Sequence, residues 1–191
     1  MIQELIVVGL EILTLVSSLL LGLLLLLFIL KFVFGKKTKI YDSLVHFFQD
    51  HYLFLVFLVS LTATIGSLFY SEILGYSPCV LCWYQRIFMY PQVFLFIIAM
   101  KIKNRSIIFN SLILSLICFL IASYHYLLQI GALNSKLLSC DVVGYTVSCS
   151  QYFSLAYGYI TIPFMALTAF LLLIILNYGK LRACPERSLT D

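Results

Sequence analysis

Long apolar runs separated by short polar stretches dominate the pattern of this chain. A helix of about 20 apolar residues crosses the roughly 30 Å hydrocarbon core of a bilayer. Five segments reach this length: residues 12–30, 52–71, 79–100, 107–130 and 157–178. Because the stretches between them are short and polar, the pattern predicts an antiparallel bundle of transmembrane helices.

The composition agrees with this interpretation. Of the 191 residues, 63% are hydrophobic and only 10% are charged, whereas soluble domains contain about 25% charged residues. A chain of this size has room for one compact membrane domain and no second folded unit.

The basic residues indicate the orientation of the helices. Ten of the twelve Lys and Arg residues follow the first, third or fifth apolar segment, and the exceptions are Arg86 and Lys136. Cytoplasmic loops are enriched in Lys and Arg, so five spans with an outward N-terminus and a cytoplasmic C-terminus are expected. The net charge of +4 therefore reflects topology, and no nucleic-acid partner is expected.

The first apolar segment could be a retained span or a cleaved signal peptide. A signal peptide begins with a positively charged region and has a short apolar core. Residues 1–11 carry Glu4 and Glu11 and no Lys or Arg, and the apolar core is longer than a signal peptide needs. The pattern favours a retained span.

Four of the six cysteines form two pairs, both on the side predicted to be external. Cys79 and Cys82 form a C-x-x-C motif at the start of the third segment, and Cys140 and Cys149 precede the fifth. A helix N-terminus stabilises a thiolate, which makes a better leaving group in disulfide exchange. Two pairs on one face permit a relay of electrons by exchange.

Simpler interpretations of the cysteines remain open. Cys140 and Cys149 could form a structural disulfide, and the four cysteines together could form a Cys₄ zinc site. Such zinc sites usually contain two short-spaced pairs, and eight residues separate Cys140 from Cys149. No metal is therefore expected.

Two polar residues lie at membrane depth near the outer surface. Arg86 follows Cys82 by four residues and shares its helix face; His125 lies near the outer end of the fourth segment. Arg86 could anchor the helix by reaching the interface. A charge inside a membrane is also a hypothesis of function, here a cation beside a thiolate or a donor to a carbonyl-bearing acceptor. His125 could donate to the same acceptor or simply pack.

Four motifs, in this order, resemble those of the DsbB/BdbC family of disulfide bond formation proteins: "PCVLCWYQR", "SYHYLLQ", "SCD" and "GYITIP". The resemblance covers roughly residues 50 to 180. It implies an all-α integral membrane protein with an antiparallel four-helix bundle core and one additional N-terminal transmembrane helix. The expected parts are the extra helix (1–35), a cytoplasmic interfacial loop (36–51), the redox domain (52–179) and a cytoplasmic tail (180–191).

The resemblance also implies an activity. The protein would be a thiol:quinone oxidoreductase of the bacterial cytoplasmic (inner) membrane, with its active cysteines on the extracytoplasmic face. It would reoxidise a DsbA-like thioredoxin-fold oxidase and pass two electrons to ubiquinone or menaquinone in the membrane lipid. Cys140 would form the mixed disulfide with this partner, and Cys149 would resolve it and exchange with Cys79.

The resemblance assigns the remaining site residues to the acceptor. Cys82 would be the sulfur that meets the quinone, and Arg86 and His125 would lie at the quinone ring. Two alternatives are a vitamin K epoxide reductase-like enzyme and a non-enzymatic membrane component with two structural disulfides. In the former, the membrane-proximal C-x-x-C follows the loop pair, whereas here it comes first.

Overall fold

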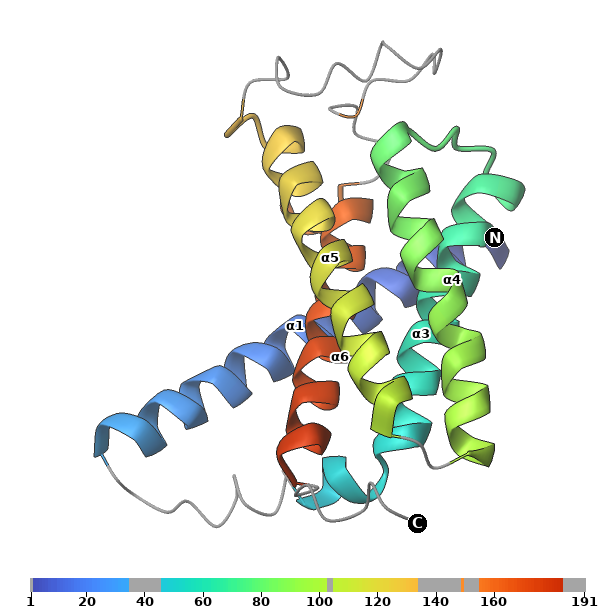
Figure 1. Cartoon of the computed structure of the whole chain (residues 1–191). Helices are drawn as coiled ribbons and strands as arrows, with labels where there is room; N and C mark the ends of the chain where they lie inside the picture. Colours follow the sequence, from blue (N-terminus) through green and yellow to red (C-terminus); the bar gives the residue numbers. More distant parts are fainter. Residues whose placement is uncertain (1, 35–45, 103–104, 134–148, 150–154, 184–191) are drawn as a thin grey trace.

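The computed structural model describes residues 2–34, 46–102, 105–133, 149 and 155–183. Apart from one bridge between Ala156 and Ile160, the regular structure of these residues is helical (Figure 1). The labelled helices are α1 (Ile2–Phe34), α3 (Tyr52–Leu68), α4 (Val80–Lys101), α5 (Arg105–Gln129) and α6 (Ile162–Ala183). A π-helical turn, η1 (Phe69–Ile73), continues α3.

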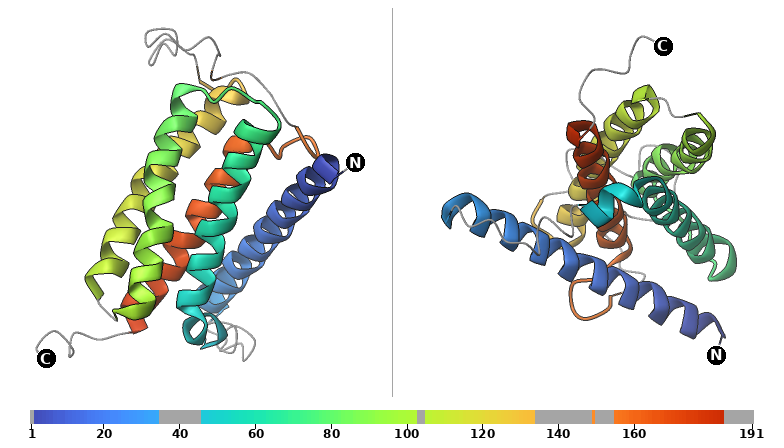
Figure 2. Two further views of the ribbon diagram at one scale, coloured as in Figure 1. Left: turned by 90° about the vertical axis from the view of Figure 1, so that its right-hand side faces the viewer. Right: turned by 90° about the horizontal axis from the view of Figure 1, so that it is seen from below.

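Helices α3, α4, α5 and α6 form a bundle in which α4 packs between α3 and α5, and α6 packs against α5 and α3 (Figures 1 and 2). One apolar cluster fills the centre, made of Tyr52, Val56, Met89, Phe96, Cys118, Ala122, Phe170 and Leu173. The predicted all-α architecture with a four-helix core is confirmed.

The bundle has the surface of a membrane protein. Large apolar side chains point outward from it; for example, Phe94 is 66% exposed and Leu120 is 67% exposed. Among the described residues, four helical stretches are long and apolar enough to cross a membrane: Gln3–Leu24, Tyr52–Ile73, Ser106–Gln129 and Ile162–Arg182. Helix α4 has a similar length, 22 residues, but carries buried Gln85, Arg86 and Gln92. The chain is a multi-pass membrane protein, and its orientation stays a prediction.

The extra N-terminal helix is present and is longer than its apolar segment predicts. Helix α1 begins at Ile2 rather than near residue 12. It lies outside the bundle and crosses it obliquely, and its far end diverges from the other helices (Figures 1 and 2). It packs mainly on α6.

Helix α6 begins at Ile162, so the prediction that this span starts at residue 157 was wrong. The physical reason is a tight turn: Tyr157 has φ 52° and Gly158 has φ 80°, and both lie in the left-handed region that ends regular helix. Ala156 and Ile160 exchange backbone hydrogen bonds of 2.9 Å across this turn. Pro163 consequently lies in the first helical turn, where its missing N–H costs little.

A chain of hydrogen bonds joins the four bundle helices near the end opposite the C-x-x-C motif. Tyr52 donates to Asn177 Oδ1, and Asn177 Nδ2 donates to Ser111 Oγ at 3.1 Å. Ser111 and Ser115 both donate to Gln92 Oε1, at 3.0 and 3.1 Å. These residues bond one another where lipid offers no partners, which fixes the helices relative to each other.

Candidate redox site

The C-x-x-C motif lies at the start of α4, as its sequence predicts. Cys79 is the residue before the helix and has an extended backbone (φ −74°, ψ 171°). Its carbonyl accepts the first helical hydrogen bond, from Trp83 N–H at 3.1 Å. Cys82 therefore lies in the first turn, close to the unpaired N–H groups and the positive end of the helix dipole.

The two thiols of the motif are free and lie 3.3 Å apart, Sγ to Sγ. His125 of α5 places Nε2 3.6 Å from Cys79 Sγ, and its Nδ1 lies 3.2 Å from Gln85 Nε2. Cys79 precedes α4. The hydrogen bond it shares with Cys82, followed by its contacts with His125, lowers the pKa of Cys79 despite its burial. Cys79 is thus the better thiolate at this helix end.

Cys79, Cys82 and His125 form the cluster with metal-binding potential in the described part of the chain. Their ligand atoms lie within 4.8 Å of one another. Two sulfurs and one imidazole suit zinc, and a bound ion would occupy both thiols of the exchanging pair. This donor set differs from the four-cysteine site considered from the sequence, since it replaces the second pair with a histidine.

Cys149 meets the motif from a distant part of the chain. It is disulfide-bonded, and it is buried in one cluster with Cys79, Leu81 and Leu128. One cysteine of the second predicted pair therefore packs with Cys79. Its predicted partner, Cys140, lies outside the described residues.

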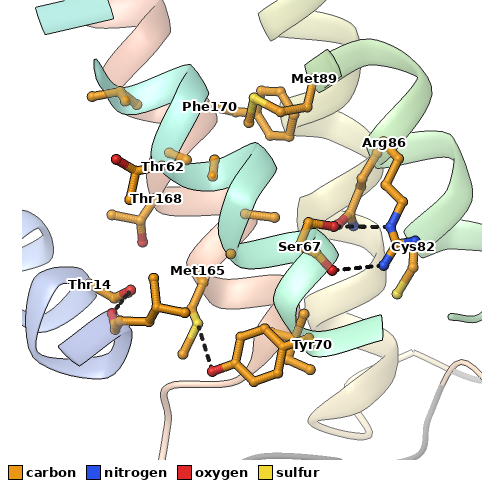
Figure 3. A pocket seen from close by; sticks show the side chains of 18 of the residues that line it. Thr14, Thr62, Ser67, Tyr70, Cys82, Arg86, Met89, Met165, Thr168 and Phe170 are labelled. Carbon is orange, nitrogen blue, oxygen red and sulfur yellow. Dashed lines mark hydrogen bonds between the residues drawn. The ribbon is translucent and has the colours of Figure 1, made fainter. Parts of the chain in front are cut away.

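Arg86 points into the bundle. It is 9% exposed, and both Nε and Nη2 donate to Ser67 of α3, to the hydroxyl and the carbonyl oxygen, at 3.0 Å each (Figure 3). Its guanidinium carbon also lies 5.4 Å from the centre of the Trp83 ring. An interfacial anchor would extend toward the headgroups, so this placement favours a functional role.

A cavity of about 460 Å³ opens beside Arg86, within the usual range of ligand pockets. Cys82, Gln85, Arg86 and Ser67 line its polar end. Figure 3 shows Arg86 and Cys82 on one side of this space and Thr14 of α1 on the other. The remaining lining is mostly apolar. It comes from α1, α3, η1 and α6, from residues 76–78 before α4, and from Met89 and Tyr90 of α4.

One cysteine of the motif lines the cavity and the other does not, although their sulfurs lie 3.3 Å apart. Cys82 is among its lining residues, whereas Cys79 and His125 are not. The structure brings Cys82 and Arg86 to the cavity, and Cys79 and His125 together beside Cys149. The expectation that His125 lies at the quinone ring stays a prediction. The imidazole contacts Cys79, which does not line the cavity, and Gln85, which does.

Two polar residues of the site were not identified from the sequence. Gln85 contacts His125 and lines the cavity; its position directly before Arg86 in the motif was an available signal. Ser67 accepts two hydrogen bonds from Arg86, and no local pattern marks it because it lies on another helix.

Comparisons with known proteins agree with this geometry. Residues 49–178 match the family model described as "Disulfide bond formation protein DsbB". The SPbeta prophage-derived disulfide bond formation protein B of Bacillus subtilis is 42% identical over 62% of this chain and 78% of its own length. A probable disulfide formation protein of Oceanobacillus iheyensis is 39% identical over 70% of this chain and 90% of its own.

A third relative, disulfide bond formation protein C of Bacillus subtilis, is 42% identical over 65% of this chain and 88% of its own length. No solved structure matches the chain. The family match includes α3, α4, α5, most of α6 and the whole C-x-x-C region, and it leaves out α1. The chain belongs to the DsbB family of disulfide bond formation proteins, membrane oxidoreductases with a role in disulfide formation.

Proposed function

We propose that this protein reoxidises a DsbA-like thioredoxin-fold oxidase and passes two electrons to a membrane quinone. The cysteines act on the extracytoplasmic face of the bacterial cytoplasmic membrane. The observation that carries the proposal is the division of the C-x-x-C pair: Cys79 packs with Cys149, whereas Cys82 lines a cavity with Arg86. One cysteine is thus placed for thiol exchange and the other for an acceptor in the membrane.

The cavity fits a quinone. A quinone combines carbonyl oxygens with an apolar tail, and this cavity combines a polar end with a mostly apolar wall. Arg86 has five N–H groups, and its two bonds to Ser67 leave others for a carbonyl oxygen. When bound, the quinone supplies a two-electron, two-proton acceptor beside Cys82.

The exchange begins at the loop pair. A thiolate of the reduced partner attacks the disulfide of Cys149, for which we propose Cys140 as the other half, and forms a mixed disulfide with Cys140. The second partner thiol then attacks the mixed disulfide, so the partner leaves oxidised and Cys140 and Cys149 are left as thiols. This step transfers two electrons and conserves the number of disulfides.

The loop pair then passes its electrons to the α4 pair. The Cys149 thiolate attacks Cys79 in the Cys79–Cys82 disulfide and releases Cys82 as a thiolate. Cys140 next attacks Cys149, which restores the loop disulfide and frees Cys79. The described state, with Cys149 bonded and Cys79 and Cys82 free, fits the stage that follows this exchange.

Residues around the motif assist the final transfer. Loss of two electrons from Cys79 and Cys82 re-forms their disulfide and releases two protons. His125 Nε2 lies 3.6 Å from Cys79 Sγ. Because the Gln85 amide donates to Nδ1, the ring proton is on Nε2, which can donate a hydrogen bond to the Cys79 thiolate. Gln85, on the other ring nitrogen, orients the imidazole.

The test is a coupled assay with purified protein, a reduced thioredoxin-fold oxidase and a quinone. We expect Cys82→Ser to abolish quinone reduction. On wild-type protein, a partner variant that keeps only its attacking cysteine should be trapped as a mixed disulfide at Cys140, because it lacks the second thiol that would release it. Cys118→Ala is the matched control, because Cys118 is a free thiol buried in the core away from the cavity wall, and it should keep most activity. A Cys82→Ser protein as active as wild type would refute the relay.

A further inference from the structure

The α1 helix forms one wall of the cavity that contains Cys82 and Arg86. Its lining residues are Leu10, Leu13, Thr14 and Ser17, which follow the i, i+3, i+4, i+7 spacing of a single helix face. Leu13 is 49% exposed although it lines the cavity, so its side chain has room for a further packing partner.

The opposite face of α1 points away from the bundle. Leu19 is 64% exposed and Val16 is 55% exposed, and neither lines the cavity. Figure 2 shows α1 along the outside of α3 and α6. The cavity therefore lies between the bundle and this helix, and α1 separates part of it from the surrounding lipid.

The contact between α1 and the bundle is close at one point. A Cβ added to Gly66 of α3 would meet the Leu10 side chain at 3.4 Å, an ordinary contact distance. Gly66 itself lines the cavity, so α1 meets α3 at the edge of the cavity.

The α1 wall offers the apolar side chains of Leu10 and Leu13 to the cavity. The Thr14 hydroxyl donates a hydrogen bond within its own helix, to Leu10 O at 2.8 Å. It therefore needs no acceptor from a ligand. The polar groups Cys82, Gln85 and Arg86 all come from α4. Figure 3 shows Cys82 and Arg86 across the space from Thr14. A ligand with a polar head and a long apolar tail matches this division, with its head at α4 and its tail along α1.

We propose that α1 is the tail-binding wall of the acceptor site and sets how strongly the protein binds a quinone with an isoprenoid tail. This inference rests on the proposed function, and it assigns a role to a helix outside the matched family region. Leu10, Leu13, Thr14 and Ser17 determine specificity and take no part in the electron transfer.

The test compares two tryptophan variants of α1 with two quinones that share a head group, one with several isoprene units and one without a tail. Leu13→Trp fills the cavity wall, and Leu19→Trp makes the same change on the outer face. We expect Leu13→Trp to raise the KM for the tailed quinone about tenfold, because the new ring displaces roughly two methylene contacts. Its KM for the tail-less quinone and its kcat should match those of Leu19→Trp.

Leu13→Trp could fail to fold, so the test also includes a variant with a smaller added side chain and a binding measurement on wild-type protein. Thr14→Leu should raise the same KM in the same direction by a smaller factor. A quinone with a photoreactive group on its tail should label a peptide within residues 3–24 of wild-type protein, and Leu13→Trp should reduce this labelling about tenfold. Excess unlabelled tailed quinone should compete for the label.

The outcomes separate the two proposals. The ratio of the KM for tailed quinone to the KM for tail-less quinone could be equal in Leu13→Trp and Leu19→Trp, or the label could be confined to α3 and α6. Either result would overturn the role of α1 and leave the proposed quinone activity intact. If added phospholipid suppresses the labelling and tailed quinone does not, the α1 wall binds a lipid acyl chain. That result would also overturn the role of α1 in quinone binding. A wild-type protein that reduces neither quinone would refute the proposed function, and the inference with it.

Discussion

At the start of α4, buried polar groups face a cavity, whereas at the opposite end of the bundle they bond one another. Arg86 uses two N–H groups on Ser67 and borders the cavity with Cys82. By contrast, Asn177 donates to Ser111 and accepts from Tyr52, and none of these three lines the cavity.

The difference separates two uses of polar residues inside a membrane. Groups that satisfy one another stabilise the arrangement of helices, at roughly 0.6 kcal/mol per interhelical bond on average. Groups held beside an apolar cavity retain capacity for a ligand. The comparison predicts that mutations of the polar residues beside the cavity, near the start of α4, reduce activity. Mutations of the polar residues at the opposite end of the bundle should reduce stability.

The largest effect is expected for Arg86→Met. Loss of a preorganised donor at an acceptor oxygen typically lowers turnover at least about 100-fold, so quinone reduction per folded molecule should fall by about this factor. Arg86→Lys keeps the charge without the planar guanidinium and should give an intermediate rate. Steady-state assays on the folded fraction measure both. Unchanged turnover in Arg86→Met would mean that Arg86 stabilises the fold, as the hydrogen-bonded residues at the opposite end do, and has no role in catalysis.

Ser111→Ala should act in the opposite way. It removes the donor to Gln92 and the acceptor for Asn177, so we expect a loss of about 1 kcal/mol of unfolding free energy. Turnover per folded molecule should stay at the wild-type value. Denaturant titration in detergent micelles measures the stability.

The matched control on the same helix is Ser123→Ala. The Ser123 hydroxyl bonds only within its helix, to Phe119 O at 2.7 Å, so its removal should leave the unfolding free energy nearly unchanged. Equal losses in the two serine variants would contradict the stabilising role of the network.

His125→Ala should change the pH dependence of Cys79. The contacts with His125 help to lower the pKa of Cys79, so removing the imidazole raises that pKa. The thiolate then forms only at higher pH, and the profile of Cys79 modification by a small thiol reagent should move to higher pH. Mass spectrometry of the modified peptide gives the profile.

Gln85→Leu sharpens this prediction, because Gln85 is hydrogen-bonded to His125, which in turn contacts Cys79. Gln85→Leu should move the pH profile of Cys79 modification to higher pH as well, by a smaller amount than His125→Ala does. A profile that stays in place in both variants would mean that the Cys82 hydrogen bond alone controls the thiol.

The smallest effect is expected for Gly66→Ala. The added methyl meets Leu10 at an ordinary 3.4 Å, and alanine is favoured over glycine in a helix by up to about 1 kcal/mol. Unfolding free energy should therefore stay equal or rise slightly, as thermal unfolding would measure. A clear loss would mean that α1 lies closer to α3 than this contact allows.

Much of the fold follows from local patterns in the sequence. Apolar segments predicted α3, α4 and α5 within a few residues, because helix length and composition must match the bilayer along each segment. The start of α6 was predicted too early. Tyr157 and Gly158 have positive φ values, which keep them out of the helix although hydrophobicity does not change there.

By itself, the sequence determined that the chain is a helical membrane protein with a C-x-x-C pair at a helix start and Arg86 one turn below Cys82. Those features depend on composition and on spacing within one helix. Only the tertiary structure decided that Cys79 meets Cys149 while Cys82 meets the cavity, that Ser67 holds Arg86, and that α1 closes one side. The reason is physical: side-chain packing between helices sets these contacts, and periodicity along one helix carries no information about its neighbours.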